Sequence, residues 1–175
     1  MWLRDSTAQV WPYLPLVRKD EGLKKMIRGL VNRQAACVLL DSYANSFYRD
    51  ASRPSAWASD QPMPAPGVHE RKWEVDSLCY VIRLAYGYWK ASGDTTPFNE
   101  RWKKSMQTLV QTFRIEQRRN GQSPYRFRRE VSARMITLMG QMFSFPVCGL
   151  PIPSPACPRI YQGLSELSTN SRVRW

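Results

Sequence analysis

Apolar residues between Leu23 and Val38 recur every three or four positions, and this periodicity constrains the fold of the chain more than any other feature. The i, i+3, i+4, i+7 spacing places them on one face of a helix, with Lys and Arg side chains on the opposite face. The residues on the apolar face are Leu23, Met26, Ile27, Leu30, Val31, Gln34 and Val38. The segment is therefore predicted to be an amphipathic helix that packs against other elements.

Three further segments have helical patterns. Residues 72–92 are predicted to form a helix that ends at Gly93, with Val75, Leu78, Ile82, Ala85 and Trp89 on its apolar face. Another helix is predicted to begin at Thr96 and Pro97 and to end near Gly121, with an apolar stripe of Trp102, Met106, Leu109, Val110 and Phe113. A short helix is predicted to enter at Thr7, capped by Asp5 or Ser6, and to end at the following prolines.

No stretch alternates convincingly between apolar and polar residues, so the predicted fold class is all-α, with the helices in antiparallel pairs. Residues 41–70 contain four prolines and lose periodicity, which predicts a long loop, and long ordered loops are often functional. Residues 131–175 contain five prolines between Pro146 and Pro158 and one acidic residue. We therefore expect a helical domain over residues 1–130 and an irregular Pro-rich tail over residues 131–175.

The chain has a net charge of +12, and residues 101–130 carry nine Lys or Arg against two acids. A basic, aromatic-interleaved stretch such as YRFRR could bind a nucleic-acid backbone, although such stretches are more often solvated helix surface. The seven Trp and eight Tyr could line a sugar site or simply pack a core. A nucleic-acid-binding helical module therefore remains an alternative at this point.

Several site classes have no signal in the sequence. The four cysteines form no CxxC pair and His69 is the only histidine, so no metal site and no cofactor is expected. No apolar run is long enough for a membrane span, and the compartment of the protein stays open. Neither a Gly-rich phosphate loop nor a nucleophile motif is present.

Two stretches place polar groups at predicted helix starts, namely WLRDS at residues 2–6 and ERKWEVDS at residues 70–77. Side chains at a helix N-terminus can cap the helix and also point toward a ligand. Glu70 and Glu74 are four residues apart and would share a face, and Lys72 and Asp76 would form a surface ion pair. Paired carboxylates can serve acid–base catalysis, but this spacing is weak evidence for it.

Four stretches together resemble glycoside hydrolase family 125: MWLRDSTAQVWPYLPL, RQAACVLLDSYANSF, ERKWEVDSLCYVIRLAYGYWKASGD and YRFRR. The resemblance covers residues 1–130. It implies part of an (α/α)6 toroid and the activity of a metal-independent, inverting exo-α-1,6-mannosidase that acts on mannose-containing glycans.

The resemblance also implies roles for individual residues. Arg4, Asp5, Glu74 and Asp76 are expected to converge on one pocket and to hydrogen-bond sugar hydroxyls, with Trp2 or Trp73 as an apolar wall. The family's catalytic acid and base come from later segments that are not recognisable here, so no catalytic residue is assigned. We therefore expect an inactive fragment in which Met1 is an internal methionine and the tail is frameshifted or mis-spliced. A non-catalytic mannose-binding relic is a further alternative.

Overall fold

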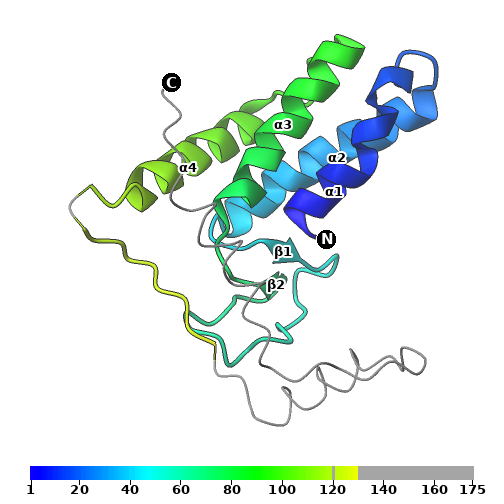
Figure 1. Ribbon diagram of the computed structural model, residues 1–175. Helices are drawn as coiled ribbons and strands as arrows, with labels where there is room; N and C mark the ends of the chain where they lie inside the picture. The colour runs from blue at the N-terminus through cyan, green and yellow to red at the C-terminus, as the bar shows by residue number, and fades with distance from the viewer. Residues whose placement is uncertain (120, 130–175) are drawn as a thin grey trace, which may run out of the picture. The chain divides into compact units, whose positions relative to one another are not determined.

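The computed structural model describes residues 1–119 and 121–129, which are mainly helical (Figure 1). The elements in chain order are α1 (Leu3–Val10), the 3-10 helix η1 (Trp11–Leu16), α2 (Glu21–Leu40), β1 (Ser46–Phe47), β2 (Val68–Glu70), α3 (Val75–Ser92) and α4 (Glu100–Glu116). The mostly helical class is confirmed. The predicted loop over residues 41–70 also contains a small antiparallel sheet, because β1 pairs with β2. The tail expected over residues 131–175 lies outside the described residues.

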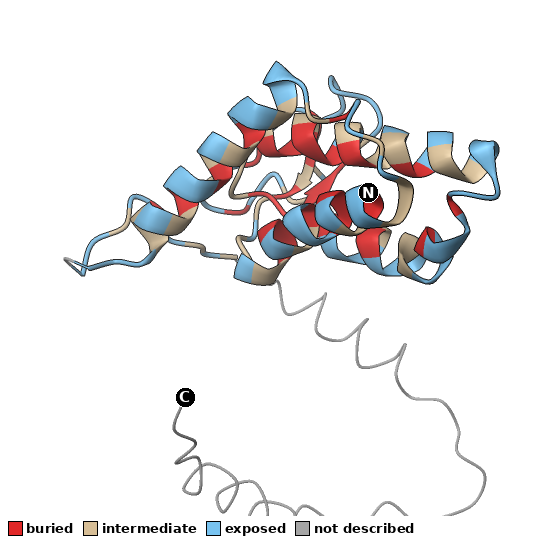
Figure 2. Cartoon of the chain, turned by 90° about the horizontal axis from the view of Figure 1, so that it is seen from above, coloured by how far each residue is buried: buried red, intermediate tan, exposed pale blue. Residues whose placement is uncertain are grey.

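The core of the described part consists of two apolar clusters between the helices. One includes Leu3, Val38, Phe47, Leu78 and Leu109, and it joins the start of α1 to the small sheet. The other includes Leu14, Ile27, Val31, Leu84 and Tyr88, around η1 and the middle of α2 and α3. Figure 2 shows that buried residues lie on the helix sides that face one another, while exposed residues cover the outer sides.

Helices α1 and α3 pack side by side, and this packing brings their first turns together (Figure 1). Thr7 Oγ1 in α1 donates a hydrogen bond to the Tyr80 carbonyl in α3 at 3.2 Å. Gln34 from α2 is fully buried behind α1, where its amide nitrogen donates to the Leu3 carbonyl at 3.1 Å and to Thr7 Oγ1 at 2.9 Å. The polar residues at the two helix starts are therefore held on a common edge.

The predicted start of the first helix is wrong, because α1 begins at Leu3 and neither Asp5 nor Ser6 caps it. Its first turn is fixed by tertiary hydrogen bonds instead of by a side-chain cap. The Leu3 N–H donates to the Asn45 carbonyl at 3.1 Å, and Trp2 forms an isolated β-bridge with Ser46. The helix does end before Pro12, as expected, and continues as η1.

The start of α4 also differs from the prediction. Asn99, and not Thr96, is the N-cap, and its side-chain oxygen accepts from the Trp102 N–H at 3.1 Å. The Thr96 N–H donates to Asp94 in the preceding turn at 2.9 Å. Gly93 does end α3 in the left-handed region, with φ of 72°, as predicted.

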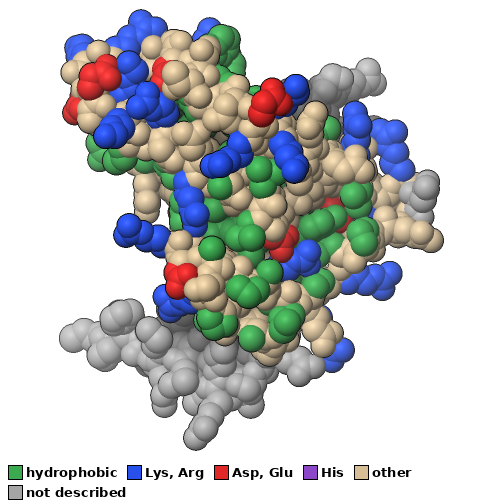
Figure 3. Space-filling model, turned by 180° about the vertical axis from the view of Figure 1, so that it is seen from behind, with side chains coloured by type: hydrophobic (Ala, Val, Ile, Leu, Met, Phe, Trp, Pro, Cys, Tyr) green, Lys and Arg blue, Asp and Glu red, His purple; other side chains and the backbone are tan. Residues whose placement is uncertain are grey.

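The apolar stripe predicted for α3 is only partly buried. Leu78 and Ala85 are buried, but Val75, Ile82 and Trp89 are 55%, 41% and 42% exposed. The buried face also includes Val81, Leu84 and Tyr88, and is rotated relative to the prediction because α1, α2 and η1 share the contact with this helix. Figure 3 shows exposed apolar side chains between Lys and Arg side chains on one face of the molecule.

Gly87 in α3 faces the side chains of η1, and its replacement by alanine is expected to destabilise the fold. A Cβ at this position would lie 2.8 Å from the Trp11 ring and 2.9 Å from Leu14. Overpacking of this kind costs about 1–3 kcal/mol.

Gly29→Ala in α2 is the matched control, since nothing lies within 4 Å of its added Cβ. That change should stabilise the protein by about 0.5–1 kcal/mol through helix propensity. Urea denaturation followed by circular dichroism measures both, and equal effects would contradict the expectation.

Candidate sugar-binding site

The first turns of α1 and α3 form a cluster of charged side chains that centres on Arg4. Its Nη1 atom donates a hydrogen bond to Asp76 Oδ2 at 2.9 Å and lies 3.9 Å from Glu74 Oε2. Its Nε atom lies 3.5 Å from Asp5 Oδ1. The structure thus brings together Arg4, Asp5, Glu74 and Asp76 from the two stretches that the sequence analysis singled out.

The four side chains are partly open to solvent. Those of Arg4, Asp5 and Asp76 are 45%, 50% and 43% exposed. Ion pairs at such exposure add little to stability, so their main effect is to order the Arg4 side chain. The hydrogen bond and charge of Asp76 raise the pKa of Arg4 further above its usual value. The cluster therefore presents a fixed cationic donor beside carboxylate acceptors, which is an arrangement that can bind neighbouring hydroxyl groups.

Two sequence-based expectations about this region are wrong. Lys72 pairs with Glu74 at 3.5 Å, and Asp76 pairs with Arg4 instead of with Lys72. Glu70 and Glu74 share no helix face, because α3 begins only at Val75 and Glu70 lies in β2. The Glu70 side chain is 8% exposed, and it binds a different group of residues on the inner side of the sheet.

The two candidate aromatic walls lie in different surroundings. Trp2 is 39% exposed, and its ring meets His69 edge-on with 5.7 Å between centroids. Trp73 is half-buried, packs against the first core cluster and lies 6.4 Å from Tyr43. Trp2 is thus the more open of the two, while Trp73 connects the start of α3 to the core.

His69 is a neighbour of the site that sequence reasoning did not select. Its ring lies between Trp2 and Tyr48, whose centroid is 5.0 Å away, and its Nδ1 atom is buried without a hydrogen-bond partner in the described part of the chain. Desolvation by burial lowers the pKa of His69, which favours the neutral imidazole. The sequence contained one indication that His69 lies beside the site, because His69 directly precedes the ERKWEVDS stretch.

Comparison with known proteins places these residues in a family. The model of the metal-independent α-mannosidases, GH125, matches residues 1–150. This chain belongs to the GH125 family. The match extends past Glu130, where the sequence resemblance was expected to end.

Two related proteins are similar to the chain over only part of their own length. A solved structure from Streptococcus pneumoniae, described as a metal-independent α-mannosidase in a non-productive substrate complex with α-1,6-mannobiose, is 42% identical, with a TM-score of 0.71. The match covers 75% of this chain and 31% of the pneumococcal one. The meiotically up-regulated gene 157 protein of Schizosaccharomyces pombe is 34% identical over 117 residues, which is 63% of this chain and 23% of the yeast protein. The chain thus spans less than a third of either relative.

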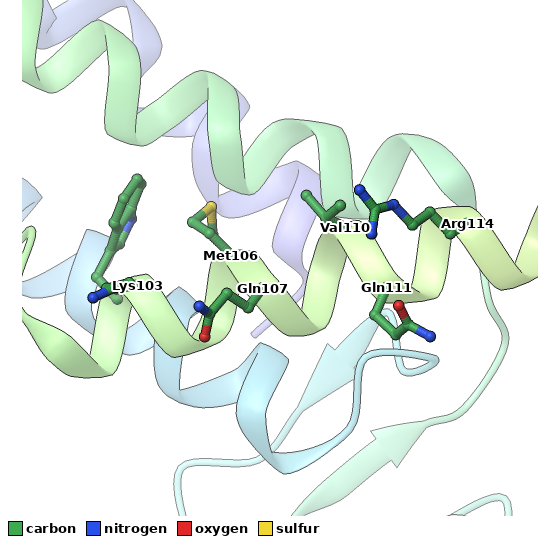
Figure 4. Close-up of a pocket in the computed structure, with 7 residues that line it drawn as sticks. Lys103, Met106, Gln107, Val110, Gln111 and Arg114 are labelled. Carbon is green, nitrogen blue, oxygen red and sulfur yellow. The ribbon is translucent and has the colours of Figure 1, made fainter.

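A metal site, a membrane span and a further pocket are the other features that could indicate a different function for this GH125 chain. The described residues contain no group of His, Cys, Asp and Glu side chains that could hold a metal ion. None of the helices in residues 1–119 or 121–129 is long and apolar enough to cross a bilayer. A pocket of about 630 Å³ runs along α4 (Figure 4). Its lining is Trp102, Lys103, Met106, Gln107, Val110, Gln111 and Arg114, which includes no carboxylate for acid–base chemistry.

Proposed function

We propose that residues 1–129 form part of the sugar-binding pocket of an inverting exo-α-1,6-mannosidase, which removes terminal α-1,6-linked mannose from glycans. The observation that carries the proposal is the Arg4–Asp76 hydrogen bond of 2.9 Å, which joins the WLRDS and ERKWEVDS stretches at one solvent-open point. The pneumococcal relative, described as a complex with α-1,6-mannobiose, supports the choice of linkage.

Each site residue has a role that follows from its chemistry. A sugar hydroxyl both donates and accepts, so it can bridge the Arg4 guanidinium and the carboxylates of Asp5, Glu74 or Asp76. Trp2 offers an open ring against which the apolar face of a mannose ring can lie, and Trp73 is the alternative wall. Trp2 is favoured because Trp73 is already packed against Tyr43 and the core.

The proposal assigns no catalytic residue among the described carboxylates. An inverting glycosidase uses one protonated carboxyl to protonate the leaving oxygen and one carboxylate to activate water, roughly 6.5–9.5 Å apart. Glu74 and Asp76 are each paired with a cation, Lys72 and Arg4 respectively. We therefore place these residues in sugar binding, and we propose that the 175 residues alone do not catalyse hydrolysis.

The proposal is tested by the affinity of the full chain for α-1,6-mannobiose in calorimetric titration. Arg4→Met should weaken binding by about tenfold or more, because a hydrogen bond to a charged group contributes about 1.5–3 kcal/mol. Arg101→Met on the exposed side of α4 is the control and should bind as the unchanged chain does. Absence of binding, or equal binding by the Arg4 variant, would contradict the proposal.

The nucleic-acid alternative makes a different prediction in the same preparation. Figure 3 shows the Lys and Arg side chains spread over the face that it displays, without a single continuous stripe. We propose that the protein does not bind nucleic acid specifically. Micromolar binding of duplex DNA that falls steeply with salt concentration, together with no binding of mannobiose, would favour the alternative.

A further inference from the structure

We propose that residues 125–129, the YRFRR stretch, position the candidate sugar site from its inner side, with Tyr125 and Arg129 as the positioning residues. This inference rests on the proposed function for its ligand. The contacts that carry it are hydrogen bonds and ion pairs among buried or half-buried groups. They run in two branches, one toward the start of α3 and one toward the start of α1.

The first branch is the hydroxyl of Tyr125. The Tyr125 side chain is 5% exposed, and its oxygen accepts a hydrogen bond from the Trp73 N–H at 2.8 Å. The same hydroxyl donates to the Arg71 carbonyl at 2.9 Å. The Tyr125 ring also stacks on Tyr43, with 4.8 Å between centroids. One hydroxyl therefore holds the extended backbone that leads directly into Glu74 and α3.

The second branch begins at the guanidinium of Arg129. It donates to both carboxylate oxygens of Asp60, at 2.7 and 2.6 Å, and to Glu70 Oε1 at 2.7 Å. The group also lies over the Trp57 ring, 3.7 Å from its centroid. Asp60 and Glu70 are almost fully buried, and the Arg129 guanidinium is a cationic partner that both carboxylates share.

Asn45 connects Glu70 to the start of α1 by hydrogen bonds. The other carboxylate oxygen of Glu70 accepts from the Asn45 side-chain amide at 2.9 Å, and the Asn45 N–H donates to the Glu70 carbonyl at 3.2 Å. The Asn45 carbonyl in turn accepts from the Leu3 N–H, the first residue of α1, at 3.1 Å. Because Arg4 directly follows Leu3 in α1, the position of the Leu3 backbone affects the direction in which the Arg4 side chain points.

In the part of the chain that the structure describes, neither branch reaches the sugar site by a direct side-chain contact. Within the described structure, neither Tyr125 nor Arg129 is hydrogen-bonded or ion-paired to Arg4, Glu74 or Asp76. Their effect on the site is therefore indirect, through the backbone of Leu3 and Trp73. Binding groups must be held within a fraction of an ångström by such supporting contacts, because small displacements of a binding group cost affinity.

Tyr125→Phe tests the first branch, with Tyr43→Phe as the matched control. Each variant removes one hydroxyl from the same pair of stacked rings, but the Tyr43 hydroxyl bonds Glu116 at 3.1 Å and not the site backbone. We expect Tyr125→Phe to bind α-1,6-mannobiose about tenfold more weakly. The amide hydrogen of Trp73 should also exchange faster in this variant. Tyr43→Phe should retain the affinity and the exchange rate at Trp73.

Amide exchange separates a failure of this inference from a failure of the proposed function. If the unchanged chain does not bind mannobiose, the proposed function is wrong, and the exchange rate at Trp73 still decides whether Tyr125 positions that backbone. Arg129→Lys tests the second branch, since it keeps the charge but loses the planar fork, and it should speed exchange at Leu3. Unchanged exchange at Trp73 and at Leu3 in the respective variants would overturn the inference.

Discussion

Arg129→Met is expected to lower the free energy of unfolding by about 3–5 kcal/mol, because it leaves a buried ionic group without its partner. Asp60 and Glu70 are 1% and 6% exposed as residues, and both carboxylates depend on the same guanidinium. Methionine keeps much of the volume of the side chain but supplies no charge and no hydrogen-bond donor. Urea denaturation of the full chain, followed by far-ultraviolet circular dichroism, gives the change directly.

Two comparisons isolate the cause of this loss. Arg126→Met removes a cation three residues away on an exposed position, and it should change stability by less than about 0.5 kcal/mol. In the Arg129→Met background, converting Asp60 to Asn and Glu70 to Gln should restore part of the stability, because the unpaired charges are then gone. If Arg129→Met and Arg126→Met were equally stable, the buried ion pairs would not have the structural role assigned to them.

The second prediction with a large effect concerns catalysis. The 175-residue chain is expected to release no mannose from α-1,6-mannobiose above the uncatalysed rate. Every Asp and Glu in residues 1–119 and 121–129 has a hydrogen-bond or ion-pair partner. Hydrogen bonds from Tyr88 and Thr96 outweigh desolvation and hold the pKa of Asp94 at about 2, and the pKa of Glu116 is lowered as well. A general acid needs the opposite shift.

The assay measures mannose release over hours at pH 5 to 7, with the pneumococcal α-mannosidase as the reference. Mannobiose that binds but is not cleaved is the expected result, and it is also what a non-catalytic mannose-binding relic would give. The two possibilities differ in whether the sequence encoded around this chain supplies an acid and a base. Turnover by the chain that disappears in Asp76→Asn would show that the assignment of Asp76 to sugar binding alone is wrong.

The charge of the YRFRR stretch illustrates what a single sequence leaves open. Its excess of arginine suggested either a surface for nucleic acid or a solvated helix face. In the structure Tyr125 is buried and Arg129 pairs with two acids that lie 59 and 69 residues earlier in the chain. A count of charges along the sequence cannot reveal such pairs, because it does not show which cations lie next to carboxylates from distant parts of the chain.

The sequence by itself determined the helical class and the family, because helical periodicity and the long motifs are local patterns that persist in any packing. It also indicated the ends of helices where the backbone is locally constrained, as at Gly93, whose φ of 72° suits glycine. The tertiary structure decided which polar residues meet. Arg4 pairs with Asp76 across 72 positions only because α1 packs along α3, and Glu70 is buried because β2 turns it toward Arg129. Spacing along one element reports contacts within that element, whereas this site is made by contacts between elements.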